Sequence, residues 1–158
     1  MRGMPSWSDF ERDAPELAAR VRTRLEAHKH MTIATLRRDG SPRISGTEAQ
    51  FVDGELWIGS MWQARKARDL QRDARFALHS GTDEPDAFAG DAKIAGLAVE
   101  ETDPDLVQRL NGGGPEGPSH LFRLDLREAS DVRHNDAGDA LVIEVWRAGE
   151  GVRRMERA

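Results

Sequence analysis

The chain has 158 residues, which is enough for one domain, residues 1–158, with a single hydrophobic core. Its formal net charge of -5 at pH 7 argues against a nucleic-acid-binding protein, since such proteins need a basic surface to displace counterions. The sequence contains no cysteine, which excludes disulfides, thiolate metal sites and cysteine nucleophiles and fits the reducing cytoplasm.

Hydrophobic residues make up 38% of the chain and charged residues 32%, which is the balance of a soluble globular protein. No apolar run is long enough to cross a membrane, and residues 1–8 lack the apolar segment of a secretory signal. We therefore expect a cytoplasmic protein that binds neither membrane nor nucleic acid.

The first expected element is a helix over about residues 14–28. Asp13 is placed to cap it, and Pro15 lies in its first turn. Apolar residues then follow at helical spacing, namely Leu17, Val21 and Leu25.

The pattern then changes to that of strands separated by turns. Asp39–Gly40 and Asp53–Gly54 are strong hairpin signals. The expected strands cover about residues 31–36, 42–52, 55–60, 75–80, 92–101, 120–126 and 140–146. Short helices are expected over about residues 64–71 and from Asp103, and residues 81–91 and 111–118 read as loops. Six or seven strands with few helices favour a closed or nearly closed β-barrel.

A basic segment follows the third of these strands. Gly59 and Ser60 lead into a loop, and Arg65, Lys66 and Arg68 then fall near the start of a helix. Cations there oppose the helix dipole, whereas a bound anion would reverse that cost, so the segment suits a phosphate group. The alternative is a solvated helix face with ion pairs at four-residue spacing, such as Arg65 with Asp69. Spacing leaves both interpretations open.

Histidines and tryptophans supply further candidates. His28 and His30 lie at a helix end with no third ligand nearby, so no metal site is expected. His120 begins a strand and is a candidate to approach a ligand. Trp62 lies in the loop of the basic segment and is a candidate to line a pocket or a dimer seam. Trp146 on the last expected strand either packs in the core or covers a ligand.

The ordered combination of motifs resembles the pyridoxamine 5'-phosphate oxidase-like family of flavin-binding proteins. The resemblance covers roughly residues 10–150 and is carried by M-T-I-A-T-L-R-R-D-G-S-P-R-I-S, G-E-L-W-I-G-S, R-K-A-R-D-L-Q-R-D-A-R-F-A-L, D-A-K-I-A-G-L-A-V-E-E-T-D and the strand ending in Trp146. It implies a mainly β fold, a six-stranded split β-barrel with flanking helices. It also implies a homodimer with the cofactor at the interface.

The resemblance assigns roles to particular residues. It implies that Arg65 and Lys66 hold the cofactor phosphate and that Ser60 adds a hydroxyl at the end of the third strand. The remaining implied cofactor contacts are Arg43, Ile44 and Ser45 along the ring system and Trp146 over it.

The implied function is a flavin- or deazaflavin-dependent oxidoreductase that acts on a small molecule. The chain ends V-W-R-A-G-E-G-V-R-R-M-E-R-A and lacks the R-L-x-P-type terminus with which pyridoxamine 5'-phosphate oxidases bind their substrate. The expected cofactor is FMN or coenzyme F-420. Both offer a phosphate to the same basic pocket, so the pocket does not distinguish them. The cofactor carries the chemistry, and no side chain is singled out as an acid or base. The alternative is a non-catalytic flavin- or haem-binding protein, or a dimeric barrel with an empty site.

Overall fold

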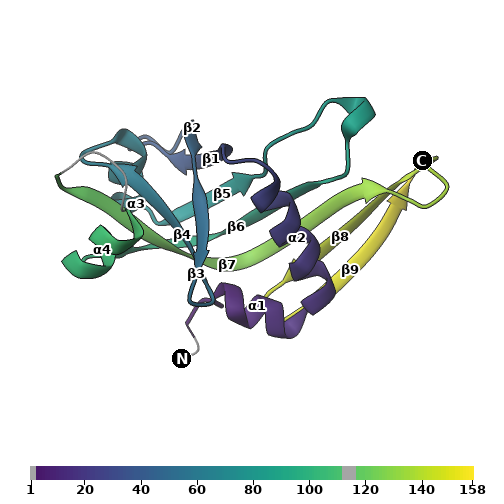
Figure 1. Cartoon of the computed structure of the whole chain (residues 1–158), viewed down its shortest axis with the longest axis horizontal. Helices are drawn as coiled ribbons and strands as arrows, with labels where there is room; N and C mark the ends of the chain where they lie inside the picture. The colour runs from purple at the N-terminus through teal and green to yellow at the C-terminus, as the bar shows by residue number, and fades with distance from the viewer. Residues whose placement is uncertain (1–2, 112–116) are drawn as a thin grey trace.

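The computed structural model describes residues 3–111 and 117–158, which form one sheet of nine antiparallel strands with flanking helices (Figure 1). The helices are α1 (Trp7–Asp13), α2 (Pro15–Ala27), α3 (Arg65–Arg72), the 3-10 helix η1 (Pro85–Ala87) and α4 (Pro104–Leu110). The strands are β1 (Met31–Leu36), β2 (Pro42–Thr47), β3 (Ala49–Val52), β4 (Glu55–Met61), β5 (Arg75–His79), β6 (Asp91–Glu101), β7 (Ser119–His134), β8 (Leu141–Arg147) and β9 (Gly151–Arg157). No helix in this described part of the chain is long and apolar enough to span a membrane.

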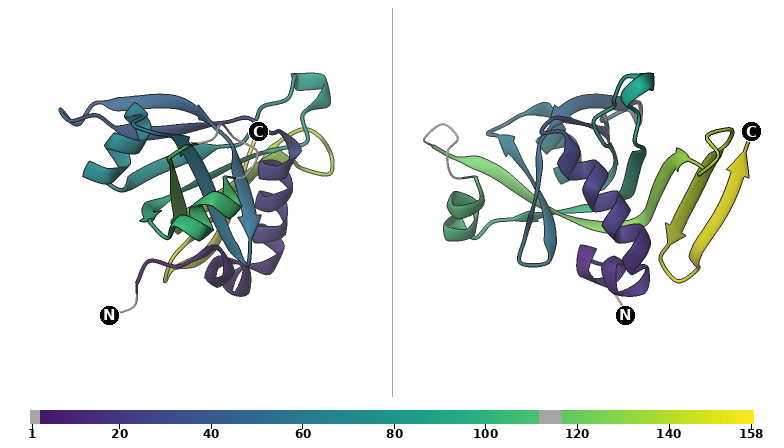
Figure 2. Two further views of the ribbon diagram at one scale, coloured as in Figure 1. Left: turned by 60° about the vertical axis from the view of Figure 1, so that its left-hand side comes forward. Right: turned by 45° about the vertical axis from the view of Figure 1, so that its right-hand side comes forward.

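Seven strands follow the order β2-β1-β5-β6-β7-β4-β3, and β8 and β9 continue from β7 as a hairpin. The two ends of the seven-strand path, β2 and β3, are separated in the sequence by Glu48 alone. The sheet must therefore curl until its two ends meet, which produces the barrel. We call residues 46–50, where the ends meet, the seam. Figure 2 shows the β8–β9 hairpin extending away from the barrel, at the opposite end from α4.

The predicted fold class, a mainly β split barrel with flanking helices, is confirmed, although the sheet has nine strands rather than six or seven. The expected strand 42–52 is two strands, because the chain turns at Glu48. The expected strand 120–126 continues to His134. β9 was not predicted, because its sequence V-R-R-M-E-R has no buried face; it is an exposed edge strand that pairs with β8 alone. The expected loop 111–118 falls mostly outside the described residues.

Helix α2 matches the helix expected over residues 14–28, with Leu17, Ala18, Val21 and Leu25 buried. The preceding α1 was missed; its Ser6 forms a capping box with Asp9. Asp13 does not cap α2, because it is the last residue of α1 and accepts a hydrogen bond from Trp146 Nε1 at 2.6 Å. Ala14 takes the capping position instead, and Pro15 opens the helix as expected.

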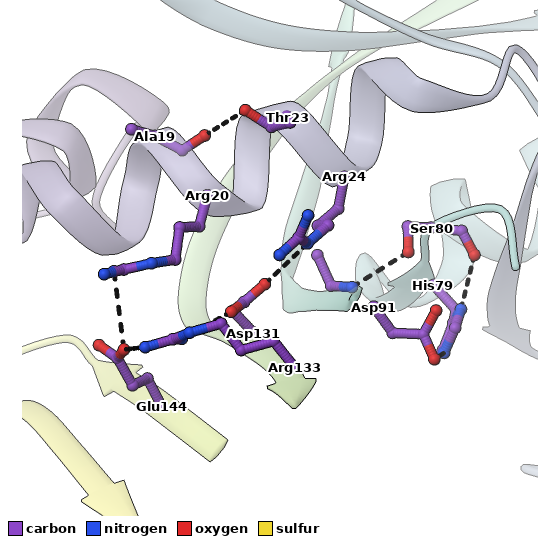
Figure 3. Close-up of polar contacts among 11 residues, drawn as sticks. Ala19, Arg20, Thr23, Arg24, His79, Ser80, Asp91, Asp131, Arg133 and Glu144 are labelled. Atoms are coloured by element: carbon purple, nitrogen blue, oxygen red, sulfur yellow. Dashed lines mark hydrogen bonds and ion pairs between the residues drawn. The ribbon is translucent and has the colours of Figure 1, made fainter. Parts of the chain in front are cut away.

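Ion pairs attach α2 to the far end of β7 (Figure 3). Asp131 is fully buried and accepts from Arg24 Nε at 3.1 Å and from Arg133 Nη1 at 2.9 Å. Arg133 also donates to Glu144 on β8 at 2.6 Å. These bonds compensate the buried carboxylate, and they explain why β7 continues past Leu126 through a sequence that looks too polar for a strand.

A second buried carboxylate attaches α3 to the barrel. Asp69 is 3% exposed and accepts hydrogen bonds from Thr35 Oγ1 at 2.8 Å, Arg43 Nε at 2.7 Å and Arg72 Nη2 at 2.9 Å. Burial raises the pKa of Asp69, but the bonds from Arg43, Thr35 and Arg72 outweigh it and hold the pKa below its ordinary value. Asp69 thus joins α3 to β1 and β2 on one side of the seam.

The Asp131 contacts predict a large loss of stability on Asp131→Asn, which leaves Arg24 and Arg133 without their buried anion. We expect the free energy of unfolding, measured by urea titration, to fall by about 3 kcal/mol. The control is Glu128→Gln, which weakens the exposed pair with Arg147 at 2.8 Å and should change stability by less than about 1 kcal/mol. Equal effects of the two variants would contradict this account.

The Asp69 contacts predict a pH dependence of stability. Because folding lowers the pKa of Asp69 below 3.8, its stabilising contribution is complete above that value and is lost as the pH falls through the folded-state pKa. Between about pH 6 and about pH 3, Asp69→Asn should therefore lose less unfolding free energy than the parent protein. Asp136→Asn, at an exposed carboxylate, serves as control, and a parent-like slope for Asp69→Asn would refute the prediction.

Candidate functional site

A cavity of about 690 Å³ lies at the seam. It is lined by the seam itself, by the end of β4 and by described residues at the two ends of the α4–β7 connection. Its described lining residues are Lys29, His30, Gly46, Thr47, Glu48, Ala49, Gln50, Gly59, Ser60, Met61, Lys66, Leu110, Asn111 and Ser119. The volume is within the range of small-molecule sites, and the lining combines one apolar wall with several hydrogen-bonding groups.

Lys66 is the predicted site residue whose position is best defined. Its Nζ donates to the Gly46 carbonyl at 2.8 Å, so it crosses from α3 to the seam. Burial lowers the pKa of Lys66, and the carboxylate of Glu48 partly opposes that shift. An ammonium has three donors, and the Gly46 bond uses one of them. Lys66 lines the cavity, so an anionic ligand there would offset the cost of burying the charge.

Ser60 also lines the cavity, as predicted. It is 7% exposed and lies near the end of β4, where its backbone is in register with His120 of β7. Among the described residues, its Oγ makes only a long contact of 3.4 Å, with the Met61 carbonyl. The hydroxyl is therefore available to bond a ligand in the cavity.

The start of α3 lacks a side-chain cap. Ala64 occupies the capping position, with no side-chain hydrogen bond to the helix among the described residues, and the first turn contains no acidic residue. The backbone N–H groups of this turn are thus open to an anion. The feature supports the phosphate interpretation of the basic segment.

Arg65 is exposed and forms no hydrogen bond or ion pair with any described residue. The alternative interpretation, a helix face laced by ion pairs, holds in part: Arg72 pairs with Asp69 at three-residue spacing, whereas Arg65 and Asp69 do not pair. Asp69 points inward to Arg43 and Arg72 instead. Arg65 therefore lies on the rim of the basic segment, with its guanidinium in solvent.

Three predicted ring contacts on β2 lie outside the described lining of the cavity. Arg43 is held by Asp69, Ile44 is 74% exposed, and Ser45 is half-buried opposite Ile33 of β1. The structure thus brings Ser60 and Lys66 together at the seam and leaves Arg43, Ile44 and Ser45 on the adjoining strand.

The two predicted tryptophans lie in different environments. Trp62 is 51% exposed beside the cavity and stacks on His120, with ring centroids 4.6 Å apart and an interplanar angle of 9°. Trp146 is 2% exposed, packs on Phe10 at 4.7 Å and bonds to Asp13. Trp146 therefore takes the core-packing role that the sequence had left open beside the cofactor role.

Much of the cavity wall was not foreseen, notably Gly46 to Gln50, Gly59 and Ser119. Gly59 carried a readable signal, since glycine inside a strand pattern often marks a close approach. A Cβ at Gly59 would clash with Asn111 Oδ1, and Asn111 in turn donates to Ser119 Oγ at 2.8 Å. The seam also contains a glycine within a strand pattern, Gly46, but a Cβ there would meet nothing within 4 Å, so this glycine does not mark a close approach.

The two histidines at the end of α2, His28 and His30, lie beside carboxylates. His28 Nε2 lies 2.7 Å from Asp83 Oδ1, and His30 Nδ1 lies 3.5 Å from Glu48 Oε1. Within residues 3–111 and 117–158, no group of three or more His, Asp or Glu side chains is arranged to hold a metal ion.

The fold is shared with several solved structures. An FMN-binding, pyridoxamine 5'-phosphate oxidase-related protein of Nostoc punctiforme matches with a TM-score of 0.64 at 12% identity, covering 89% of this chain and 94% of that one. PhzG of Burkholderia lata, in complex with tetrahydrophenazine-1-carboxylic acid, matches with a TM-score of 0.60 at 16% identity over 88% and 84% of the chains. A protein described as F420 reductase matches with a TM-score of 0.54 at 20% identity over 68% and 93%. At these identities the likeness concerns the fold alone.

Sequence comparison gives the family directly. No curated protein matches the chain. The family model described as pyridoxamine 5'-phosphate oxidase matches residues 17–133, a stretch that runs from α2 to the end of β7 and includes both Ser60 and Lys66. The chain belongs to the pyridoxamine 5'-phosphate oxidase family.

Proposed function

We propose that the chain binds FMN or coenzyme F-420 at the seam cavity and works as an oxidoreductase on a small-molecule substrate. The observation that carries the proposal is the convergence of Lys66 and Ser60 in one cavity at the uncapped start of α3, in a chain of this family. The names of two structural neighbours, an FMN-binding protein and an F420 reductase, support a cofactor of the flavin type.

The residues present fit a phosphate-bearing group. Lys66 supplies a cation that already lies in the cavity wall, Ser60 supplies a hydroxyl donor, and the first turn of α3 supplies backbone N–H groups. Arg65 is on the same turn and would reach the phosphate from the solvent side. A bound flavin or deazaflavin supplies the hydride chemistry.

The rest of the cavity would position the ligand. Gln50, Asn111 and Ser119 present neutral polar groups, while Leu110 and Met61 give an apolar wall. Such a wall excludes water from one face of a planar ring. The chain's own part is thus to bind, orient and shield, and its described residues assign no acid or base to the reaction.

A haem-binding function without turnover is the second candidate, and it rests on His30, an exposed histidine in the cavity lining. The absorption spectrum of the purified protein, with and without added cofactor, separates the candidates. A flavin or deazaflavin spectrum supports the proposal, and a Soret band supports haem.

The phosphate assignment predicts that Lys66→Met weakens binding of FMN or F-420 by about ten- to 150-fold, since a charge-assisted contact contributes about 1.5–3 kcal/mol. Fluorescence titration measures the affinity. Lys93→Met is the matched control, because Lys93 is exposed on β6 and lies outside the cavity lining; it should bind like the parent. If Lys66→Met binds the cofactor as tightly as the parent, Lys66 does not contact the phosphate.

We also propose that two copies of the chain assemble and complete the cavity. Three large apolar side chains are exposed on the strand and loop beside it, namely Ile44 at 74%, Met61 at 78% and Trp62 at 51%. Exposed apolar groups gathered near a cavity are typical of an interface. A second copy laid over them would close the site on its open side.

This assembly predicts a solution mass of about twice 17.6 kDa by sedimentation equilibrium at micromolar concentration. Ile44→Glu should shift the protein towards monomer, because it would bury a charge in the interface. Val152→Glu, at a 45% exposed residue of β9, should remain dimeric. A monomeric parent protein, or equal dissociation of both variants, would exclude this interface.

A further inference from the structure

The turn between β4 and α3 is held by a side chain that the proposed function does not use. His120, on β7, is 3% exposed, and its ring lies behind this turn. The backbone N–H of Gln63 donates to His120 Nε2 at 3.2 Å. His120 Nδ1 lies 2.9 Å from Glu100 Oε1 of β6. One imidazole therefore connects the turn to two strands of the barrel.

These partners define the state of the ring. A backbone N–H can only donate, so Nε2 must carry a lone pair and the proton must reside on Nδ1, which donates to Glu100. Glu100 accepts in addition from Gln71 Nε2 of α3, at 2.8 and 3.1 Å. The neutral Nδ1–H tautomer thus lies in a chain of hydrogen bonds that begins at the turn and ends on α3 itself.

The turn needs such support because its backbone is strained. Gln63 has a φ of 63°, in the left-handed region that non-glycine residues rarely occupy. Its side chain is held by Arg68 of α3, and the neighbouring Trp62 covers the His120 ring. Two residues beyond Gln63 the first turn of α3 begins, with Arg65 and Lys66.

We propose that His120 is a positioning residue for the anion site: as a neutral imidazole it fixes the Gln63 turn and thereby the direction in which the start of α3 presents its N–H groups and Lys66. This inference rests on the proposed function for its ligand, but the hydrogen-bond chain itself is independent of it. Releasing the turn would let the first turn of α3 move relative to Ser60, and the phosphate contacts would no longer be made together.

Two substitutions separate the two bonds of the ring. In His120→Gln the amide oxygen reaches about as far as Nε2 and keeps an acceptor for Gln63 N–H. In His120→Asn the shorter amide reaches about as far as Nδ1. It keeps a donor for Glu100 but loses the acceptor for the Gln63 N–H. Both variants lose the stacking with Trp62 equally, so each is the matched control for the other.

FMN and F-420 affinity should fall about three- to tenfold in His120→Asn and stay within about twofold of the parent in His120→Gln, as expected for loss of one hydrogen bond. Both should unfold at similar urea concentrations. Equal affinities in the two variants, or a larger loss in His120→Gln, would overturn the proposal.

A second readout needs no ligand. Nitrogen NMR of the parent should show the Nδ1–H tautomer at His120, and amide exchange at Gln63 should be slow in the parent and in His120→Gln but fast in His120→Asn. The other tautomer, or fast exchange in the parent, would contradict the hydrogen bond between Gln63 N–H and His120 Nε2 and overturn the proposal. If the parent binds neither FMN nor F-420, the proposed function fails. The amide exchange and the tautomer then test by themselves whether His120 holds the turn.

Discussion

The barrel depends on one constraint of chain connectivity. β2 and β3 are the two ends of the strand path, yet Glu48 is the only residue between them. A flat sheet of seven strands would hold its end strands far apart, since neighbouring strands are about 4.8 Å apart. The sheet therefore curls, and the chain turns from one end of the path to the other at the seam. The cavity lies at this turn, and residues 46–50 form part of its wall.

Helix α3 is placed against the seam by buried polar contacts rather than by a large apolar face. It buries Ala67 and Leu70, and its third buried residue is Asp69. The carboxylate draws Arg43 and Arg72 inward and leaves Lys66 on the side of the cavity. The start and the middle of the helix are thus chemically distinct: the start is cationic and has no side-chain cap among the described residues, while the middle is neutralised within the fold. This arrangement places the Lys66 ammonium at the seam of a protein whose net charge is -5.

The sequence predicted the parts of the fold that depend on local pattern. The sequence pattern predicted β1, β4, β5 and β6, and glycine turns marked the hairpins. Family resemblance then pointed to Ser60 and Lys66, both of which line the cavity. The turn at Glu48 could not be predicted, because residues 42–52 are extended on both sides of it and the nearest glycine, Gly46, lies inside β2 rather than at the change of direction.

Other features were missed because they depend on contacts between distant segments. Asp69 is four residues from both Arg65 and Asp73, which suggested a row of charged side chains on a solvated helix face. In the structure its partners Thr35 and Arg43 are on strands β1 and β2. Asp13 looked like a helix cap because it stands just before Pro15. Its actual partner, Trp146, lies 133 residues away and could not be recognised from the local sequence. The second half of β7 looked like a loop because its charges are compensated by α2 and β8. A local pattern shows that a residue is polar but does not show which distant group satisfies it.

The exposed edge strand β9 affects how copies of the chain can meet. Antiparallel pairing of β9 with a second β9 about its central residue would set Arg154 against Arg154, with Arg153 and Arg157 adding further positive charge along the same strand. Sheet extension through this edge is thus discouraged by repulsion, as is common for strands that must remain unpaired. The charges on β9 thus oppose self-association through this edge, whereas the proposed assembly uses the apolar side chains beside the cavity.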